Sequence, residues 1–205
     1  SGAAPLTDAR QGSADLRALV FHGSEADLAQ TALTQPALFA IEYALARWWQ
    51  HQGLLPDLLV GHSLGEFTAA VIAGVMPVAD AARLVALRGQ LIQALPAGAM
   101  LAVRQPAAEV APRLPSELSI ATINAPEACV VAGPEAAIDA LARQLEAEGI
   151  ANQRLKTSHA FHSAMMEPAV SPFERAVSRV RLSAPTIPIV SGRTGRPLTD
   201  AEATD

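Results

Sequence analysis

The pattern of apolar and polar residues along the chain predicts an α/β protein. Apolar residues recur every three to four positions in several segments, as on one face of a helix, and shorter apolar runs bounded by proline or glycine are typical of strands. We expect helices at residues 36–52, 64–73, 77–94, 107–113, 134–148 and 173–180, and strands at 58–60, 100–103, 118–123, 128–132, 153–156 and 187–190.

The elements between residues 97 and 157 have an order of their own. They follow one another as strand, helix, strand, strand, helix and strand, which is the split βαβ or ferredoxin-like arrangement. We therefore expect residues 1–96 to begin a larger α/β subdomain with a parallel sheet, residues 97–157 to form a small inserted ferredoxin-like subdomain, and residues 158–205 to return to the larger one.

Composition and charge exclude several classes of protein. Half of the 205 residues are hydrophobic and 17% are charged, which indicates a globular chain. The net charge of −5 argues against a general nucleic-acid binder, and no apolar stretch reaches the ~20 residues that a membrane span needs. The single cysteine, Cys129, leaves no internal disulfide or cysteine-based metal cluster and lies in an apolar run, so we expect a small core residue and a reducing, cytoplasmic setting.

One serine lies between two glycines where an apolar run gives way to helical spacing. The sequence G-H-S-L-G occupies residues 61–65, after the expected strand and at the start of the expected helix. This is the G-x-S-x-G pattern, in which a sharp strand-to-helix turn exposes the hydroxyl of a nucleophile, here Ser63. The alternative is an ordinary βα turn with Ser63 as a helix N-cap.

A serine hydroxyl needs a neighbouring base to act as a nucleophile. Of the five histidines, His22 and His51 lie in polar stretches that we expect to be exposed, and His62 adjoins the serine, where we expect a structural role. His159 and His162 lie in the run SHAFHSAMMEP, where the chain re-enters the larger subdomain. A loop there can fold over the sharp turn at Ser63, which is called the nucleophile elbow. Spacing alone does not choose between these two.

An arginine lies on the apolar face of the helix expected at residues 77–94. At about 100° per residue, Arg88 falls in the middle of an apolar stripe, whose members are Ala81, Leu84, Val85, Leu91, Ile92 and Leu95. A buried guanidinium needs a carboxylate to offset its desolvation. That carboxylate belongs either to an internal Asp or Glu or to a substrate held in two-pronged fashion.

Several motifs resemble those of the malonyl-CoA:acyl-carrier-protein transacylases. They are G-H-S-L-G-E at 61–66, L-R-G at 87–89, N-A-P at 124–126 and H-A-F-H-S at 159–163, with T-Q-P-A-L-F at 34–39 matching as well. The chain is most similar to the acyltransferase domains of modular type I polyketide synthases, and the resemblance covers about residues 16–190.

The resemblance implies a role for each matching residue. It implies Ser63 as nucleophile, His162 as its base and Arg88 as the clamp for the malonate carboxylate. The N–H of Leu64, at the start of the elbow helix, becomes an oxyanion donor. It further implies a hydrolase-like larger subdomain beside the small ferredoxin-like one. The partners that it implies are malonyl-CoA, an acyl carrier protein and neighbouring polyketide synthase domains, with no bound cofactor.

The motif H-A-F-H also resembles the malonyl-selective pattern of the family. Methylmalonyl-selective members tend to carry Y-A-S-H at this place. We therefore expect His159 and Phe161 to contact the substrate, with the phenyl ring of Phe161 filling the space of an α-methyl group. The alternative is that Phe161 is only core packing.

The ends of the chain depart from the family pattern. The family begins with a strand and a Gly-Gln-Gly-type loop whose glutamine contributes to the oxyanion hole. Residues 10–13, R-Q-G-S, have similar letters but follow no apolar strand, so we expect an accidental match and a tail at residues 1–12. The family also continues beyond the last residue, so we expect an internal fragment of the domain.

Two other functions share some of these residues. A serine hydrolase, such as an esterase or editing thioesterase, has the same elbow, but its chain order is serine, acid, histidine, and an apolar pocket has no use for Arg88. A docking fragment that only binds carrier protein could use the five arginines between residues 175 and 196, although a solvated basic face is the simpler interpretation.

Overall fold

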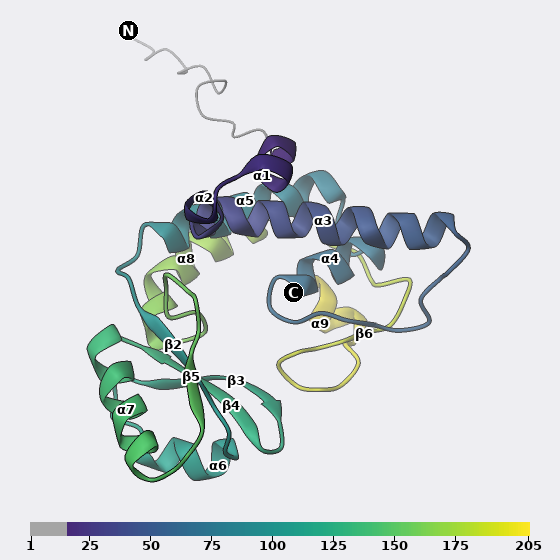
Figure 1. Ribbon diagram of the computed structural model, residues 1–205. Helices are drawn as coiled ribbons and strands as arrows, with labels where there is room; N and C mark the ends of the chain where they lie inside the picture. The colour runs from purple at the N-terminus through teal and green to yellow at the C-terminus, as the bar shows by residue number, and fades with distance from the viewer. Residues whose placement is uncertain (1–15) are drawn as a thin grey trace, which may run out of the picture.

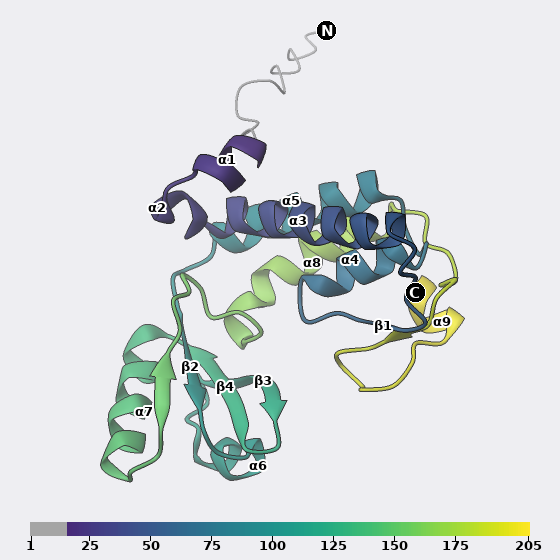
Figure 2. The same ribbon diagram turned by 45° about the vertical axis from the view of Figure 1, so that its right-hand side comes forward.

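The computed structural model describes residues 16–205. The tail expected at residues 1–12 and the R-Q-G-S stretch lie outside the described residues. The chain forms a helical part with a two-stranded parallel sheet, and a smaller part with a four-stranded sheet. Figures 1 and 2 show the smaller part below the helices, joined to them by two chain segments.

The larger part consists mainly of helices. Its helices are α1 (Leu16–His22), α2 (Glu25–Leu28), α3 (Thr31–His51), α4 (Gly65–Ile72), α5 (Val78–Gln93), the 3-10 turn η2 (Ala164–Met166), α8 (Glu167–Val177) and α9 (Asp200–Thr204). Helix α3 packs along α5, and α5 also packs against α8. In Figure 1 these three helices lie side by side above the small sheet.

Two helices begin earlier than the sequence predicts. Helix α3 begins at Thr31 rather than at residue 36, and α8 begins at Glu167 rather than at residue 173. Both therefore contain a proline inside the helix, Pro36 and Pro172, where each removes one backbone donor. Packing of these segments against α5 stabilises the helical turns that the prolines alone disfavour.

The smaller part confirms the predicted ferredoxin-like order. It contains β2 (Ala99–Val103), α6 (Ala107–Val110), η1 (Ala111–Arg113), β3 (Ser119–Ala125), β4 (Ala128–Gly133), α7 (Glu135–Ala147) and β5 (Asn152–Arg154). The strands form an antiparallel sheet in the order β3-β4-β2-β5. Helix α7 buries Ile138 and Leu145 against one face. Cys129 is a buried core residue there, as predicted, and burial raises the pKa of its thiol.

The second face of this sheet carries the histidine loop. Ala160 is fully buried against Met100 and Val130. Close by, a Cβ atom placed on Gly98 would lie 2.8 Å from the Cβ of Ala160, and the N–H of Gly98 donates to the carbonyl of Ser158 at 3.2 Å. The two segments that join the parts are therefore in contact, so the loop is fixed relative to both.

The parallel sheet of the larger part positions the elbow. Strand β1 (Leu59–Val60) pairs with β6 (Ile189–Val190), with Leu59 opposite Ile189. Ala69 and Ala73 of the α4 region pack onto this pair. Both strands fall where the sequence predicts them, and within residues 16–205 they are the only strands of this sheet.

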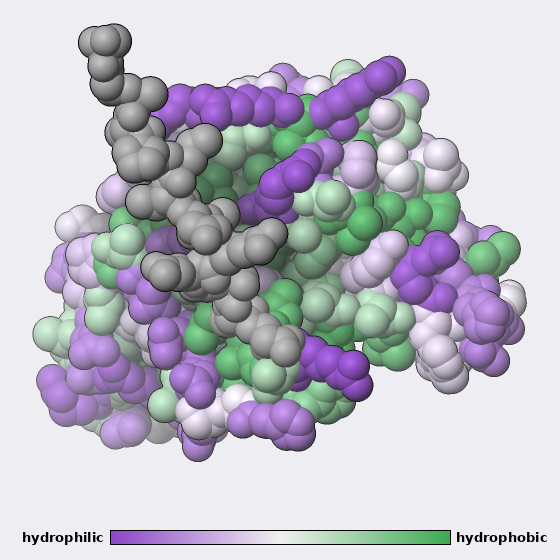
Figure 3. Space-filling model, turned by 90° about the horizontal axis from the view of Figure 1, so that it is seen from above, coloured by the Kyte–Doolittle hydropathy of each residue, from purple (hydrophilic) through white to green (hydrophobic). Residues whose placement is uncertain are grey.

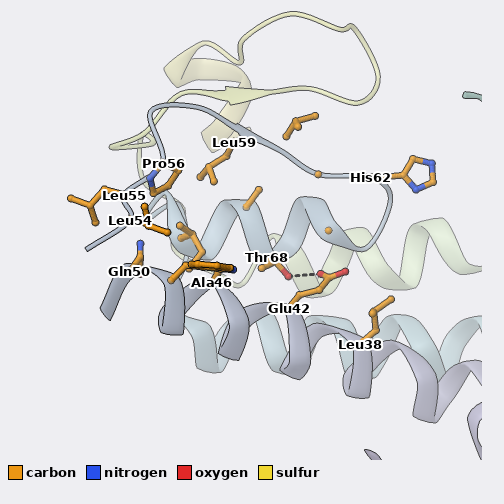
Figure 4. A pocket seen from close by; sticks show the side chains of 16 residues that line it. Leu38, Glu42, Ala46, Gln50, Leu54, Leu55, Pro56, Leu59, His62 and Thr68 are labelled. Atoms are coloured by element: carbon orange, nitrogen blue, oxygen red, sulfur yellow. Dashed lines mark hydrogen bonds between the residues drawn. The ribbon is translucent and has the colours of Figure 1, made fainter. Parts of the chain in front are cut away.

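An apolar groove opens beside this sheet, between α3, α4 and residues 54–62. It has a volume of about 700 Å³. Figure 4 shows Leu54, Leu55 and Pro56 at one end, His62 at the other and the Glu42–Thr68 hydrogen bond between the two helices. Apolar side chains also gather on the helical face seen from above in Figure 3. No helix in the described part of the chain is long and apolar enough to cross a membrane.

Candidate active site

Ser63 lies on a strained turn between β1 and α4. Its φ of 54° is in the left-handed region, which costs energy for any residue with a Cβ atom. The turn is so tight that a Cβ atom on Gly61 would lie 2.3 Å from the nitrogen of Glu66. The N-cap of α4 is Leu64, without a side-chain cap, so Ser63 is not the N-cap of an ordinary turn. The predicted sharp strand-to-helix turn at Ser63 is the observed geometry.

His162 is the histidine that the fold brings to this serine. Its Nε2 lies 2.8 Å from Ser63 Oγ, a hydrogen bond between residues 99 positions apart. His162 has a φ of 60°, and it and Ser63 are the two non-glycine residues with positive φ among residues 16–205. Strained backbone of this kind clusters at functional sites, because the surrounding structure must hold it in place.

The surroundings of His162 lower the pKa of its imidazole. Burial is the largest cause, followed by the positive charges of Arg88 and His62, while Glu66 acts in the opposite direction. A lowered pKa keeps the ring neutral at neutral pH, so that Nε2 can accept the proton of Ser63. This is the protonation state that a general base requires.

Arg88 lies in the same neighbourhood, without an acidic partner in the part of the chain that the structure describes. Its Nη1 donates to Oε1 of Gln35 at 2.5 Å, and Arg88 forms no ion pair with any carboxylate among residues 16–205. Burial lowers the pKa of its guanidinium. Of the two sequence-based interpretations, an internal Asp or Glu partner is therefore wrong for the described part of the chain.

A cavity of about 150 Å³ connects these residues. Arg88 lines it together with His162 and Phe161, and α8 contributes Phe173 to its wall. A second cavity of about 280 Å³ is lined by Ser63 and again by His162. His162 therefore separates a cavity that holds a cation from a cavity that holds the serine hydroxyl.

The backbone N–H of Leu64 adjoins the serine at the start of α4. It has no hydrogen-bond acceptor within the part of the chain that the structure describes. The positive end of the helix dipole adds to the local potential. This free N–H can donate to an oxygen that becomes negative beside Ser63 Oγ.

His159 does not reach either cavity, in contrast to the prediction that it contacts substrate. Its side chain is 3% exposed. Its Nε2 lies 3.2 Å from the carbonyl oxygen of Leu95, which can only accept, so Nδ1 accepts from the hydroxyl of Ser158 at 2.8 Å. The ring lies beside that of Phe161 at a centroid distance of 6.3 Å. His159 thus supports Phe161 from behind, because the backbone turn aims its ring at the core.

Two polar side chains of this region were not predicted from the sequence. Gln35, the hydrogen-bond partner of Arg88, is almost fully buried. Glu66 accepts from the N–H of Gly192 at 2.9 Å and so connects the elbow helix to the loop after β6. Both lie in the quoted motifs, Gln35 in T-Q-P-A-L-F and Glu66 in G-H-S-L-G-E. A polar residue next to apolar ones in a motif is the sequence feature that could have identified them. His62 is exposed and lines the serine cavity.

Ser63 lies on a strand-to-helix turn, hydrogen-bonded to a neutral histidine and next to a free backbone N–H. This arrangement is typical of a serine-dependent acyl-transfer site. Comparison with known proteins agrees with this class. The model of the acyl transferase domain family matches residues 10–204, and the chain belongs to this family.

The relatives include polyketide synthases, acyltransferase domains of such synthases and malonyl CoA-acyl carrier protein transacylases. A phenolphthiocerol synthesis polyketide synthase type I Pks15/1 of Mycobacterium marinum is 48% identical over 181 residues, which are 88% of this chain and 9% of the relative. The acyltransferase domain of the second module of the salinomycin polyketide synthase is 45% identical, with a TM-score of 0.88 over 93% of this chain and 46% of that one. The malonyl CoA-acyl carrier protein transacylase of Coxiella burnetii is 30% identical, with a TM-score of 0.84 over 91% and 63%.

These comparisons confirm the α/β fold class and the predicted family. The chain spans about half the length of the solved acyltransferase domain from the salinomycin synthase, and a much smaller share of the curated relative.

Proposed function

We propose that this chain carries the reaction site of an acyltransferase that moves a malonyl group from malonyl-CoA to an acyl carrier protein in polyketide synthesis. The single observation that carries the proposal is the hydrogen bond between Ser63 Oγ and His162 Nε2, beside a half-buried Arg88 that has no acidic partner in the described chain. Family membership supports acyl transfer, and the unpaired cation supports a donor with a free carboxylate.

The first step acylates the serine. His162 Nε2 takes the hydroxyl proton while Ser63 Oγ attacks the thioester carbonyl carbon of malonyl-CoA. The resulting oxyanion accepts from the N–H of Leu64. The C–S bond then breaks, the leaving thiolate takes the proton from His162, and a malonyl ester remains on Ser63 with free CoA.

The second step transfers the group to the carrier protein. The thiol of the carrier's phosphopantetheine arm gives its proton to His162, and the sulfur attacks the carbonyl carbon of the ester. The C–O bond breaks, and Ser63 Oγ recovers the proton from His162. The histidine thus acts once as base and once as acid in each step.

Phe161 supports malonyl rather than methylmalonyl as the donor group. Its ring lines the cavity that Arg88 and His162 also line. A donor held between these two groups would place its central carbon close to the ring. Steric rejection of one methyl group is worth about 10- to 200-fold in selectivity. We expect Phe161→Ser to reduce the preference for malonyl-CoA over methylmalonyl-CoA in a competition assay.

Intact-protein mass after incubation with malonyl-CoA tests the proposal directly. We use an acyltransferase domain that contains this sequence, and expect a malonyl adduct that is absent in Ser63→Ala. His162→Ala should slow adduct formation by a factor on the order of 10² to 10⁴. An adduct that persists in Ser63→Ala contradicts the assignment. An adduct lost rapidly to water without carrier protein indicates a hydrolase, and no adduct in the wild type indicates a docking role.

Donor selection tests the role of Arg88. Arg88→Ala should lose malonyl transfer while it keeps or gains transfer of an uncharged acetyl group, because a cation without its partner penalises neutral donors. Equal loss of both transfers would show that Arg88 has a structural role only.

A further inference from the structure

The hydrogen-bond partner of Arg88 is itself held by a second buried partner. Gln35 Oε1 accepts from Arg88 Nη1 at 2.5 Å, and Gln35 Nε2 donates to Thr31 Oγ1 at 2.8 Å. The side chains of Gln35 and Thr31 are 6% and 4% exposed. A guanidinium has only donors, so the amide oxygen must face Arg88 and the amide nitrogen must face Thr31. The orientation of the amide is therefore determined from both ends.

The backbone holds this chain of hydrogen bonds at a fixed distance. At Gly89, next to Arg88, a Cβ atom would lie 2.9 Å from the carbonyl oxygen of Thr31 and 3.1 Å from the Cα atom of Ala32. Helices α3 and α5 are thus in direct backbone contact where the two side chains meet. Groups on rigid packed helices keep their geometry better than groups on loops.

The chemistry of the partner matters as much as its place. A carboxylate at this position would neutralise the guanidinium and occupy it with a buried ion pair. A neutral amide uses one of the five N–H donors and leaves the full positive charge beside the cavity that Phe161 and His162 line. An amide can therefore orient Arg88 without reducing its attraction for an incoming anion.

We propose that Gln35 is a positioning residue, which aims the Arg88 guanidinium at the carboxylate of the acyl donor and keeps it free of any internal acid. Thr31 holds the amide in the orientation that this requires. The inference rests on the proposed function, because it assumes a donor with a carboxylate.

The test compares malonyl-CoA with acetyl-CoA as donors in an acyltransferase domain that contains this sequence. Gln35→Glu keeps the shape of the side chain and adds a competing carboxylate. We expect kcat/KM for malonyl-CoA to fall roughly 10- to 100-fold, mainly through KM, the range that a charge-assisted hydrogen bond supplies. Acetyl transfer should stay unchanged or rise, because acetyl has no carboxylate to be displaced.

Further variants separate positioning from folding. Gln35→Met removes the amide without adding charge and should give a smaller loss with the same malonyl bias. Thr31→Val should shift the donor ratio in the same direction, and Thr31→Ser, which keeps the hydroxyl, should restore it. Gln30→Glu is the matched control, because it makes the same change at an exposed residue that precedes α3, and should leave the ratio unchanged.

Each outcome has a definite meaning. Equal losses of malonyl and acetyl transfer in Gln35→Glu and Gln35→Met would overturn the proposal and show a structural glutamine. An unchanged KM for malonyl-CoA in Gln35→Glu would overturn it as well. If the wild type forms a malonyl ester on Ser63 in either case, the proposed function stands while this inference fails. A wild type without that ester would remove both.

Discussion

At the level of single residues, the site depends on a histidine that stays neutral close to positive charge. The pKa of His162 is lowered first by burial and then by Arg88 and His62. A base in this position loses activity only when the pH falls below its lowered pKa. The same cation that is proposed to bind the donor therefore also keeps the base unprotonated.

His62 offers a test of this electrostatic coupling, since no substrate contact is assigned to it. In His62→Gln a positive charge is removed, so the pKa of His162 rises and the histidine is protonated at higher pH. The acidic limb of kcat/KM for malonyl-CoA should then move to higher pH. The same change at the exposed His51 should leave the limb in place. A limb that stays in place, as in the control, would mean that His62 does not act through its charge.

At the level of elements, the two glycines of the strand-to-helix turn differ in the space that is available for a side chain. A Cβ atom on Gly61 would lie 2.3 Å from the nitrogen of Glu66, whereas on Gly65 it would meet only Glu42 Oε2 at 3.9 Å. Gly65 is the first residue of α4. The turn therefore needs glycine at the first position for space, and the second glycine is sterically free.

Substitution of the two glycines should give opposite results. Gly61→Ala forces the turn open and should lower the free energy of unfolding by at least about 1–3 kcal/mol, with loss of the serine adduct. Gly65→Ala should be neutral or stabilise by up to about 1 kcal/mol, because alanine favours the helix. Thermal unfolding and adduct mass measure both. Equal losses of stability in the two variants would contradict the steric account.

At the level of the whole molecule, the site is assembled between two parts of the chain. Ser63 belongs to the elbow of the helical part, while the loop with His162 lies on the second face of the small sheet through Ala160. Gly98 fits against Ala160 where the two parts join. The contact between Ser63 and His162 therefore depends on the junction as well as on either part.

Gly98→Ala should disturb the reaction more than the fold. The added methyl group lies 2.8 Å from the Cβ of Ala160 and pushes the histidine loop away from Ser63. A misplacement of about 1 Å can cost on the order of 10² in rate. We expect such a fall in kcat with near-normal circular dichroism, and Gly65→Ala again provides the control. Unchanged kcat would show that the junction has more freedom than its packing suggests.

The apolar groove leads us to expect that the isolated chain associates with itself. Leu55 and Val60 at its rim are 74% and 73% exposed, and apolar surface of this extent is a liability for association. The chain alone should bind the dye ANS and associate as its concentration rises. The double change Leu54→Glu, Leu55→Glu, at two exposed residues that line the groove, should reduce both effects. Ile123→Glu, at an exposed position of the small sheet, should not, and equal effects would contradict a role for the groove.

Local patterns in the sequence were enough to predict most of the elements and several site residues. The elbow around Ser63 and the inward face of Arg88 depend on residues within a few positions of each other, so spacing alone indicates them. The ferredoxin-like order followed from the succession of elements. The early starts of α3 and α8 were missed, because packing against α5 outweighs the local effect of Pro36 and Pro172.

Only the tertiary structure decided which groups meet. From the residues alone His159 and His162 stayed equivalent, and a resemblance was needed to choose; in the structure a left-handed turn aims His162 at Ser63 and buries His159 against the carbonyl of Leu95. The partner of Arg88 is Gln35, 53 positions away, rather than an acid. Such contacts join residues that are far apart along the chain, so the local periodicity of the sequence does not indicate which of them meet. They are determined by the packing of whole elements, which the local pattern of residues does not encode.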